Sequence, residues 1–133
     1  MSGRQLPLPP GVVRRVVERV LTGERRRAHI SVTFLGRDSM RRLNARFKGH
    51  DRPTDVLTFA LRDPRGGAVG DVYVCSWVAR REARARGVPL RQELIRLVVH
   101  GTLHALGRDH PEGPDRIRSA MWRRQERYVE ALA

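Results

Sequence analysis

The segment from Pro89 to Leu106 constrains the fold most strongly. It carries apolar residues on nearly every side of a helix: Leu94, Ile95, Leu97, Val98, Val99 and Leu103. A helix that is apolar all round has to be buried. Pro89 is suited to the start of this helix. The segment therefore predicts one long central helix around which the other elements pack, and His100 and His104 lie on it.

The remaining chain alternates between the two periodicities of secondary structure. A first helix is predicted from Pro10, with valines on one face, and a second from Asp38 as N-cap, with Met40, Leu43 and Phe47 on the core face. A third is predicted from Ser76, as the cap, to Arg86. The last is predicted from Asp115 to Leu132, with Met121, Tyr128 and Leu132 on one stripe. Strands are predicted over Ile30–Leu35, Val56–Leu61 and Val72–Cys75, the last two paired. The pattern predicts one α+β domain over residues 1–133, with a small mixed β-sheet, surrounding helices and a central metal-bearing helix.

The histidines on and after the central helix predict a metal site. His100 and His104 are four residues apart, so they project from one helical face. Gly107 can adopt the positive φ that ends a helix, which lets the chain return His110 as a third ligand. Three of the five histidines lie in this run. Three imidazoles with one open coordination position are typical of catalytic zinc, although imidazole also suits nickel, copper and iron.

Two families have related spacings. The metzincin peptidases have His-Glu-x-x-His-x-x-Gly-x-x-His, in which the Glu is the general base. Here that position is Gly101, which cannot accept a proton. The YbeY family of bacterial endoribonucleases has His-Gly-x-Leu-His-x-x-Gly-x-Asp-His, and this sequence matches every fixed position.

The resemblance to the YbeY family extends from about Ile30 to Met121. The matching segments are Leu43-Asn44, Phe47, Asp51-x-Pro53-Thr54-Asp55-Val56-Leu57-Thr58-Phe59 and Gly70-Asp71-Val72-Tyr73-Val74-Cys75. The resemblance implies a single-strand-specific, zinc-dependent endoribonuclease that processes the 3′ end of 16S ribosomal RNA during ribosome maturation. Its partners would be ribosomal RNA and the small ribosomal subunit. The alternatives are a metallopeptidase-like metal hydrolase and a ribosome assembly factor with a structural metal.

Lys48 departs from the family pattern. The family usually has a functional Arg at this position, beside the metal site, and Lys48 is the only lysine among 27 Lys and Arg residues. Lysine keeps the charge but lacks the bidentate fork that grips a phosphate. The resemblance thus implies catalytic roles for His100 and Lys48. Neighbouring Arg46 or Arg52 could substitute for Lys48, and a solvated surface lysine is the alternative.

Four acidic residues are further candidates. Glu93, seven residues before His100, is a weak candidate base or partner of the metal ligands, or else a carboxylate that stabilises the helix start. Asp109 is expected to orient a ligand or to form the turn before His110. Asp55, with Thr54, and Asp71 are expected to shape the loop beside the site, and contact with the substrate or the metal ligands is the alternative.

The composition limits the partners and the setting. The net charge of +13 favours polyanions such as RNA, although a bias toward Arg codons would also produce it. No apolar run is long enough to cross a membrane, and no signal peptide is recognisable. The single cysteine, Cys75, agrees with a reducing cytoplasm and is expected to be buried packing. The oligomeric state is left open.

Overall fold

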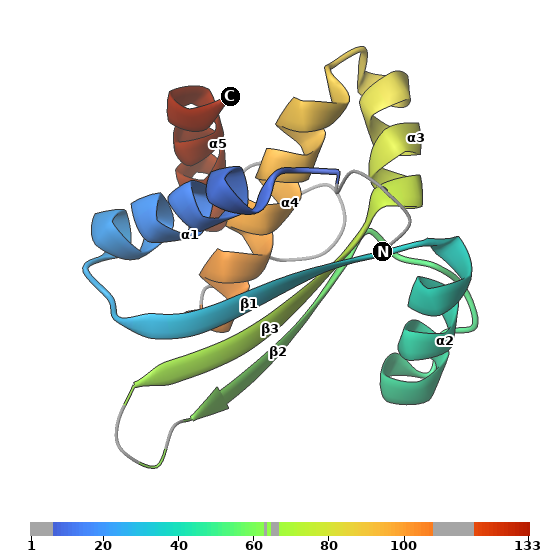
Figure 1. Cartoon of the computed structure of the whole chain (residues 1–133), viewed down its shortest axis with the longest axis horizontal. Coiled ribbons are helices and arrows are strands. Elements are labelled where there is room, and N and C mark those ends of the chain that lie inside the picture. Colours follow the sequence, from blue (N-terminus) through green and yellow to red (C-terminus); the bar gives the residue numbers. More distant parts are fainter. Residues whose placement is uncertain (1–6, 63, 65–66, 108–118) are drawn as a thin grey trace.

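The computed structural model describes residues 7–62, 64, 67–107 and 119–133. Its elements, in chain order, are α1 (Pro10–Glu24), β1 (Ala28–Leu35), α2 (Arg37–Lys48), β2 (Val56–Arg62), β3 (Ala68–Cys75), α3 (Ser76–Arg86), α4 (Leu90–Ala105) and α5 (Ala120–Leu132). Figure 1 shows α1, α4 and α5 gathered on one side of the sheet and α2 at its far end. The predicted α+β class is confirmed.

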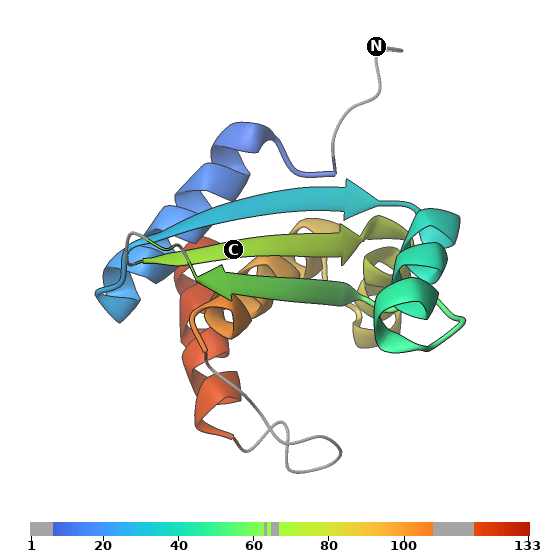
Figure 2. The same cartoon turned by 90° about the horizontal axis from the view of Figure 1, so that it is seen from below.

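The three strands form one mixed sheet in the order β1-β3-β2. β1 runs parallel to β3, whereas β2 runs antiparallel to β3. The expected pairing of the second and third strands is therefore confirmed. β1 and β3 each begin earlier than predicted because their first residues, Ala28 and Ala68, pair with each other. Figure 2 shows the strands side by side, with α2 at the end toward which β1 and β3 run.

Helix α4 is the centre of the molecule. It packs against β2 and β3 on one face of the sheet and against α1, α3 and α5 on its other sides. Leu94, Ile95, Val98 and Leu103 have no exposed surface. The apolar surface that α4 buries is the main source of stability in such a core, because burial removes that surface from water. The predicted central helix is confirmed as buried.

A smaller core lies on the opposite face of the sheet. Met40 of α2, Leu57 of β2 and Cys75 of β3 form it. Cys75 is fully buried, as predicted, and desolvation raises the pKa of its thiol above the ordinary value. A buried thiol that is held protonated is a packing residue and a poor nucleophile.

The helix starts differ from the prediction at two places. α2 begins at Arg37 after Gly36, so Asp38 lies within the first turn and is not the N-cap. Its carboxylate still has a favourable place near the helix N-terminus. Ser76 is the first residue of α3, and its hydroxyl donates to the Leu35 carbonyl at 3.4 Å, so it joins α3 to β1 and does not cap the helix.

One predicted helical face needs correction. Phe47, expected in the core, is 53% exposed, because it lies in the last turn of α2. On α5 the predicted stripe is confirmed, since Met121 is buried in the core and Tyr128 and Leu132 pack against it; Gln125 and Val129 are also buried. α5 begins at Ala120, and the predicted start at Asp115 lies outside the described residues.

Candidate metal centre

The two histidines of α4 lie side by side. Their ring centroids are 4.8 Å apart and the ring planes differ by 46°. His100 is 7% exposed and His104 is half-buried. α4 ends just beyond His104, and Gly107 has a φ of 90°, the positive value that was predicted for the turn. The helix thus brings two imidazoles together at the point where the chain turns back.

The third predicted ligand, His110, lies outside the described residues, as does Asp109. Within the ranges that the structure describes, no group of three or more His, Cys, Asp or Glu side chains could hold a metal ion. The three-histidine site therefore stays a prediction. The two imidazoles that are described fit such a site in donor type, since neutral imidazole is a common ligand of zinc and related ions.

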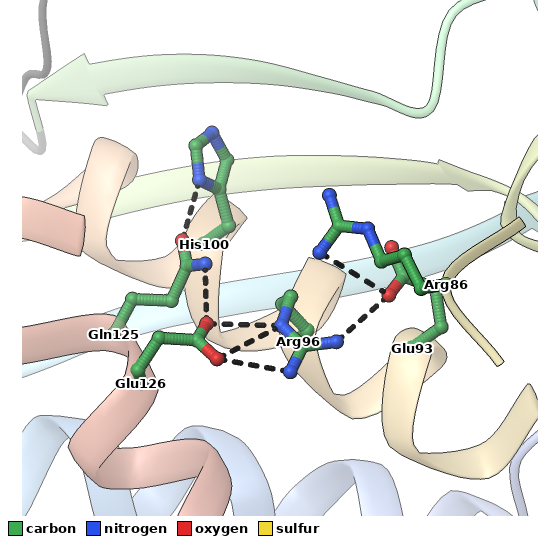
Figure 3. A network of polar contacts seen from close by, with 6 residues as sticks. All are labelled: Arg86, Glu93, Arg96, His100, Gln125 and Glu126. Atoms are coloured by element: carbon green, nitrogen blue, oxygen red, sulfur yellow. Dashed lines mark hydrogen bonds and ion pairs between the residues drawn. The ribbon is translucent and has the colours of Figure 1, made fainter. Parts of the chain in front are cut away.

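His100 is tied to α5 by a hydrogen bond. Its Nδ1 lies 2.7 Å from Oε1 of Gln125, and both residues are buried. Gln125 Nε2 donates to Glu126 at 3.0 Å, and Arg96 of α4 donates to the same carboxylate at 2.9 Å (Figure 3). Burial alone would raise the pKa of Glu126, but the hydrogen bonds from Arg96 and Gln125 outweigh it and lower that pKa. The bonds to Glu126 raise the pKa of the Arg96 guanidinium.

Glu93 belongs to the same polar network. Its carboxylate accepts from Arg96 Nη1 at 2.8 Å and lies 3.8 Å from Arg86 Nη1. Its side chain is 2% exposed. The structure therefore shows Glu93 in a buried ion pair that joins α4 to its surroundings, and a role for it beside the metal ligands stays a prediction.

Gly101 explains why this helix cannot carry the peptidase motif. A Cβ atom at Gly101 would overlap the Val72 side chain of β3 and would come within 3.3 Å of Thr58 Oγ1 of β2. The helix backbone rests directly on the sheet at this point. A glutamate in this position would have to enter the packed helix–sheet interface, which leaves no room for a general base there.

Lys48 lies beside β2. Its Nζ lies 5.4 Å from the ring centroid of Phe59. Successive side chains of a strand point to opposite faces. Because Thr58 faces Gly101 on α4, Phe59 lies on the other face of the sheet. Lys48 therefore contacts a side chain on the face of β2 that points away from α4, and its role beside the metal site stays a prediction.

The two possible substitutes for Lys48 are near it. The Arg46 guanidinium lies 5.2 Å from the centroid of the Phe47 ring, and Arg52 is an exposed loop residue whose carbonyl accepts from Asn44. All these cations lie toward the α2 end of the molecule. Their exposure makes them available to an anionic partner.

Asp55 and Asp71 both have local structural roles. Asp55 accepts from the Val56 backbone amide at 2.7 Å and from Thr54 Oγ1 at 3.4 Å, which shapes the start of β2 as expected. Asp71 accepts from Ser31 of β1 across the sheet. It alternates with Val72 and so lies on the face away from α4.

A cavity of about 650 Å³ lies at the C-terminal end of α4. It is lined by Arg26, Arg27, Leu61, Leu106 and Gly107, among others. Arg26 Nη1 donates to the Leu106 carbonyl at 3.2 Å, where a helix end needs donors. Only the tertiary fold shows that Arg26 and Arg27, which lie in the turn before β1, border the end of α4. A cavity of about 770 Å³ between α1 and β1 has no predicted site residue in its lining.

Sequence reasoning assigned no functional role to four residues of the polar network: Arg86, Arg96, Gln125 and Glu126. A signal existed for one of them. Gln125 is four residues after Met121 and four before Val129, so it is a polar residue within an apolar stripe. Buried polar side chains require partners, which marks such a residue for a tertiary hydrogen bond.

The fold and these histidines define an α+β protein with a buried helix that carries a candidate metal centre. A family model described as endoribonuclease YbeY matches residues 10–133. A Thermotoga petrophila protein named endoribonuclease YbeY is 36% identical over 120 residues, which cover 90% of this chain and 78% of that protein. The chain belongs to the YbeY family.

Two further relatives agree with this assignment. A Burkholderia lata protein of the same name is 44% identical over 84 residues, covering 62% of this chain and 49% of the relative. The solution structure of a Thermotoga maritima protein superposes with a TM-score of 0.64 at 34% identity, covering 90% of this chain and 78% of that one. None of the helices that the structure describes is long and apolar enough to cross a membrane.

Proposed function

We propose that this chain is a metal-dependent endoribonuclease that cleaves single-stranded ribosomal RNA during maturation of the small ribosomal subunit. In this proposal the 3′ end of 16S ribosomal RNA is the substrate, the cytoplasm is the setting, and His100, His104 and His110 hold one zinc ion or another divalent transition metal. Membership of a family whose named relatives are endoribonucleases supports the reaction type. The finer substrate is the one that the sequence resemblance implies.

One observation carries the metal-dependent part of the proposal. His100 and His104 present two imidazoles 4.8 Å apart on the most buried helix of the fold, at its end. A site on a rigid element holds its ligands more accurately than one on a loop. When bound, a metal ion in such a site polarises a phosphodiester oxygen and lowers the pKa of a water molecule.

The chain's own residues would bind and orient the RNA. Arg26 and Arg27 line the cavity next to the end of α4 and provide donors for phosphate oxygens. The net charge of +13 attracts the RNA backbone as a whole. Lys48, beside Phe59 of β2, would add a further cation for the RNA strand.

The alternatives differ in what the packing supports. A metallopeptidase of the zincin type requires a glutamate where Gly101 rests against Val72 and Thr58, and the contact excludes one. An assembly factor with a structural metal makes a different prediction. In that case the histidines would matter for stability and not for cleavage.

The test measures metal content and cleavage on the same preparations. We expect about one ion per chain in the wild-type protein by elemental analysis, and its loss in His104→Ala. Single-stranded RNA cleavage should stop in that variant and after chelation, while a casein-type substrate stays intact. His29→Ala, which removes an exposed histidine on β1, should change neither property.

Binding separates the enzyme from the assembly factor. His100→Ala should still bind RNA within a few-fold of the wild type at equal salt, because the distributed charge supplies most of the attraction. It should cleave poorly. Cleavage at the wild-type rate by a metal-free histidine variant would overturn the proposal and leave the metal a structural role.

A further inference from the structure

The hydrogen bond between His100 and Gln125 can be made in two ways. Nδ1 can donate to the amide oxygen, or an unprotonated Nδ1 can accept from a flipped amide nitrogen. The two arrangements place the proton of the neutral ring on different nitrogens. Nδ1 and Oε1 are 2.7 Å apart, and Gln125 is 1% exposed, so water does not compete at this contact.

Glu126 decides between the two arrangements. Gln125 Nε2 lies 3.0 Å from Glu126 Oε2. A carboxylate has no hydrogen to donate, so the amide nitrogen has to face it and the amide oxygen has to face His100. The lowered pKa of Glu126 keeps this group ionised at neutral pH. A flipped amide would put its oxygen against the carboxylate, and two acceptors would then be in contact.

The carboxylate of Glu126 is itself fixed. Arg96 Nε donates to its two oxygens at 2.9 and 3.2 Å, and Arg96 Nη2 adds a bond of 2.9 Å. Arg96 is held from its other side by Glu93, which Arg86 also approaches (Figure 3). Two carboxylates and two guanidinium groups therefore balance in charge, and each member of the chain of contacts orients the next.

We propose that Gln125 is a positioning residue that holds His100 as the Nδ1–H tautomer, and that the Glu126–Arg96 ion pair fixes the orientation of the Gln125 amide. In that tautomer Nε2 carries the lone pair with which the ring would bind the metal. The use of this tautomer for metal binding rests on the proposed function. The tautomer itself is a property of the metal-free protein. Loss of such an outer partner of a metal-bound histidine typically weakens metal binding about 10- to 100-fold.

The direct test uses the metal-free, full-length protein labelled with ¹⁵N at its histidines. Long-range ¹H–¹⁵N correlation spectra at a pH where imidazole is neutral distinguish the two tautomers. We expect His100 with a protonated Nδ1 and an unprotonated Nε2. The opposite tautomer in the wild-type protein would overturn the inference, whether or not the protein proves to be a metal-dependent nuclease.

Variants then test the chain of contacts. In Gln125→Leu the acceptor is lost, so we expect a mixture of tautomers and a Zn²⁺ affinity, measured against a chromophoric chelator, that is about 10- to 100-fold weaker. Glu126→Gln keeps the size of the side chain but allows the Gln125 amide to flip, so the same changes should appear in weaker form. This second variant keeps the test decisive if Gln125→Leu does not fold.

Tyr128→Phe is the matched control. It removes a different hydrogen bond from the same helix, the 2.7 Å bond from Tyr128 to Glu24, which has no part in the His100 contacts. We expect it to leave the His100 tautomer and the Zn²⁺ affinity unchanged. Equal loss of affinity in Tyr128→Phe and Gln125→Leu would mean that α5 acts only through general stability, and would also overturn the inference.

Discussion

Two ion pairs, one on each side of the sheet, differ sharply in burial. On the α4 face, the side chain of Arg96 is 9% exposed and that of Glu93 is 2% exposed, and they pair at 2.8 Å. On the α2 face, Arg41 and Asp51 are 45% and 79% exposed and meet only at 3.5 Å. The buried charges have fixed partners because an unpaired buried charge is very costly, whereas water stabilises the exposed ones.

This contrast separates two requirements of the proposed activity. A metal ligand needs a fixed orientation, and the buried contacts of His100 supply it. Attraction of a long polyanion needs only exposed positive charge at a range of about a Debye length, and flexible side chains are sufficient for that. Lys48, which the family resemblance groups with the histidines, is an exposed cation beside Phe59.

The largest expected effect is loss of the buried guanidinium. Arg96→Ala leaves the carboxylates of Glu93 and Glu126 close together without their shared partner. We expect the free energy of unfolding in urea to fall by about 3–5 kcal/mol, the usual cost of breaking a buried ion pair. Arg41→Ala on the α2 face should cost at most about 1 kcal/mol. Equal losses would show that the two faces do not differ as described.

The contact between α4 and the sheet gives the next effect. Gly101→Ala adds a methyl group that meets Val72, so we expect a loss of about 1–3 kcal/mol in thermal or urea unfolding. Gly11→Ala on α1 is the matched substitution, since nothing lies within 4 Å of a Cβ there. It should stabilise the protein by about 0.4–1 kcal/mol by restricting the unfolded chain. A harmless Gly101→Ala would reopen the peptidase alternative.

The elements dominated by one clear periodicity were predictable from the sequence. α4 carries apolar residues on nearly every side, and the neighbouring positions of its two histidines follow directly from their four-residue spacing. Local sequence did not reveal that Phe47, although in phase with Met40, stays 53% exposed while its ring meets the edge of Phe59. It also could not pair Arg96 with Glu126, because that contact joins residues 30 positions apart through the packing of α4 on α5.

Acid should remove the contribution of Glu126. Its pKa in the folded protein lies below the ordinary value of 4.5, so its stabilisation is complete above about pH 4.5 and is lost as the pH falls through the lower, folded-state pKa. Glu126→Gln mimics the protonated group. We expect the free energy of unfolding in urea near neutral pH to be about 1.5–3 kcal/mol higher for the wild-type protein than for Glu126→Gln. The difference should shrink below about pH 4.5; a gap that does not change with pH would exclude this carboxylate as its source.

The smallest effect on stability is expected at Lys48. An exposed cation over an aromatic ring contributes about 0.5–1 kcal/mol at most, so Lys48→Ala should unfold nearly as the wild type does and should keep its metal. We expect slower cleavage of single-stranded RNA because a cation is lost where the strand would pass β2, and Lys48→Arg should retain the rate because the charge is kept.

Arg81→Ala controls for the loss of one positive charge, since Arg81 also lies over an aromatic ring, 4.8 Å from the centroid of Trp77 on α3. If cleavage depends only on net charge, Arg81→Ala and Lys48→Ala will reduce the cleavage rate equally. A specific role for Lys48 requires a larger loss of cleavage rate in Lys48→Ala than in Arg81→Ala. The rates should be measured at several salt concentrations, so that the effect of the overall charge can be separated from the effect of Lys48. Unchanged turnover in Lys48→Ala would transfer the role to Arg46 or Arg52, whose exposed side chains lie at the same end of the sheet.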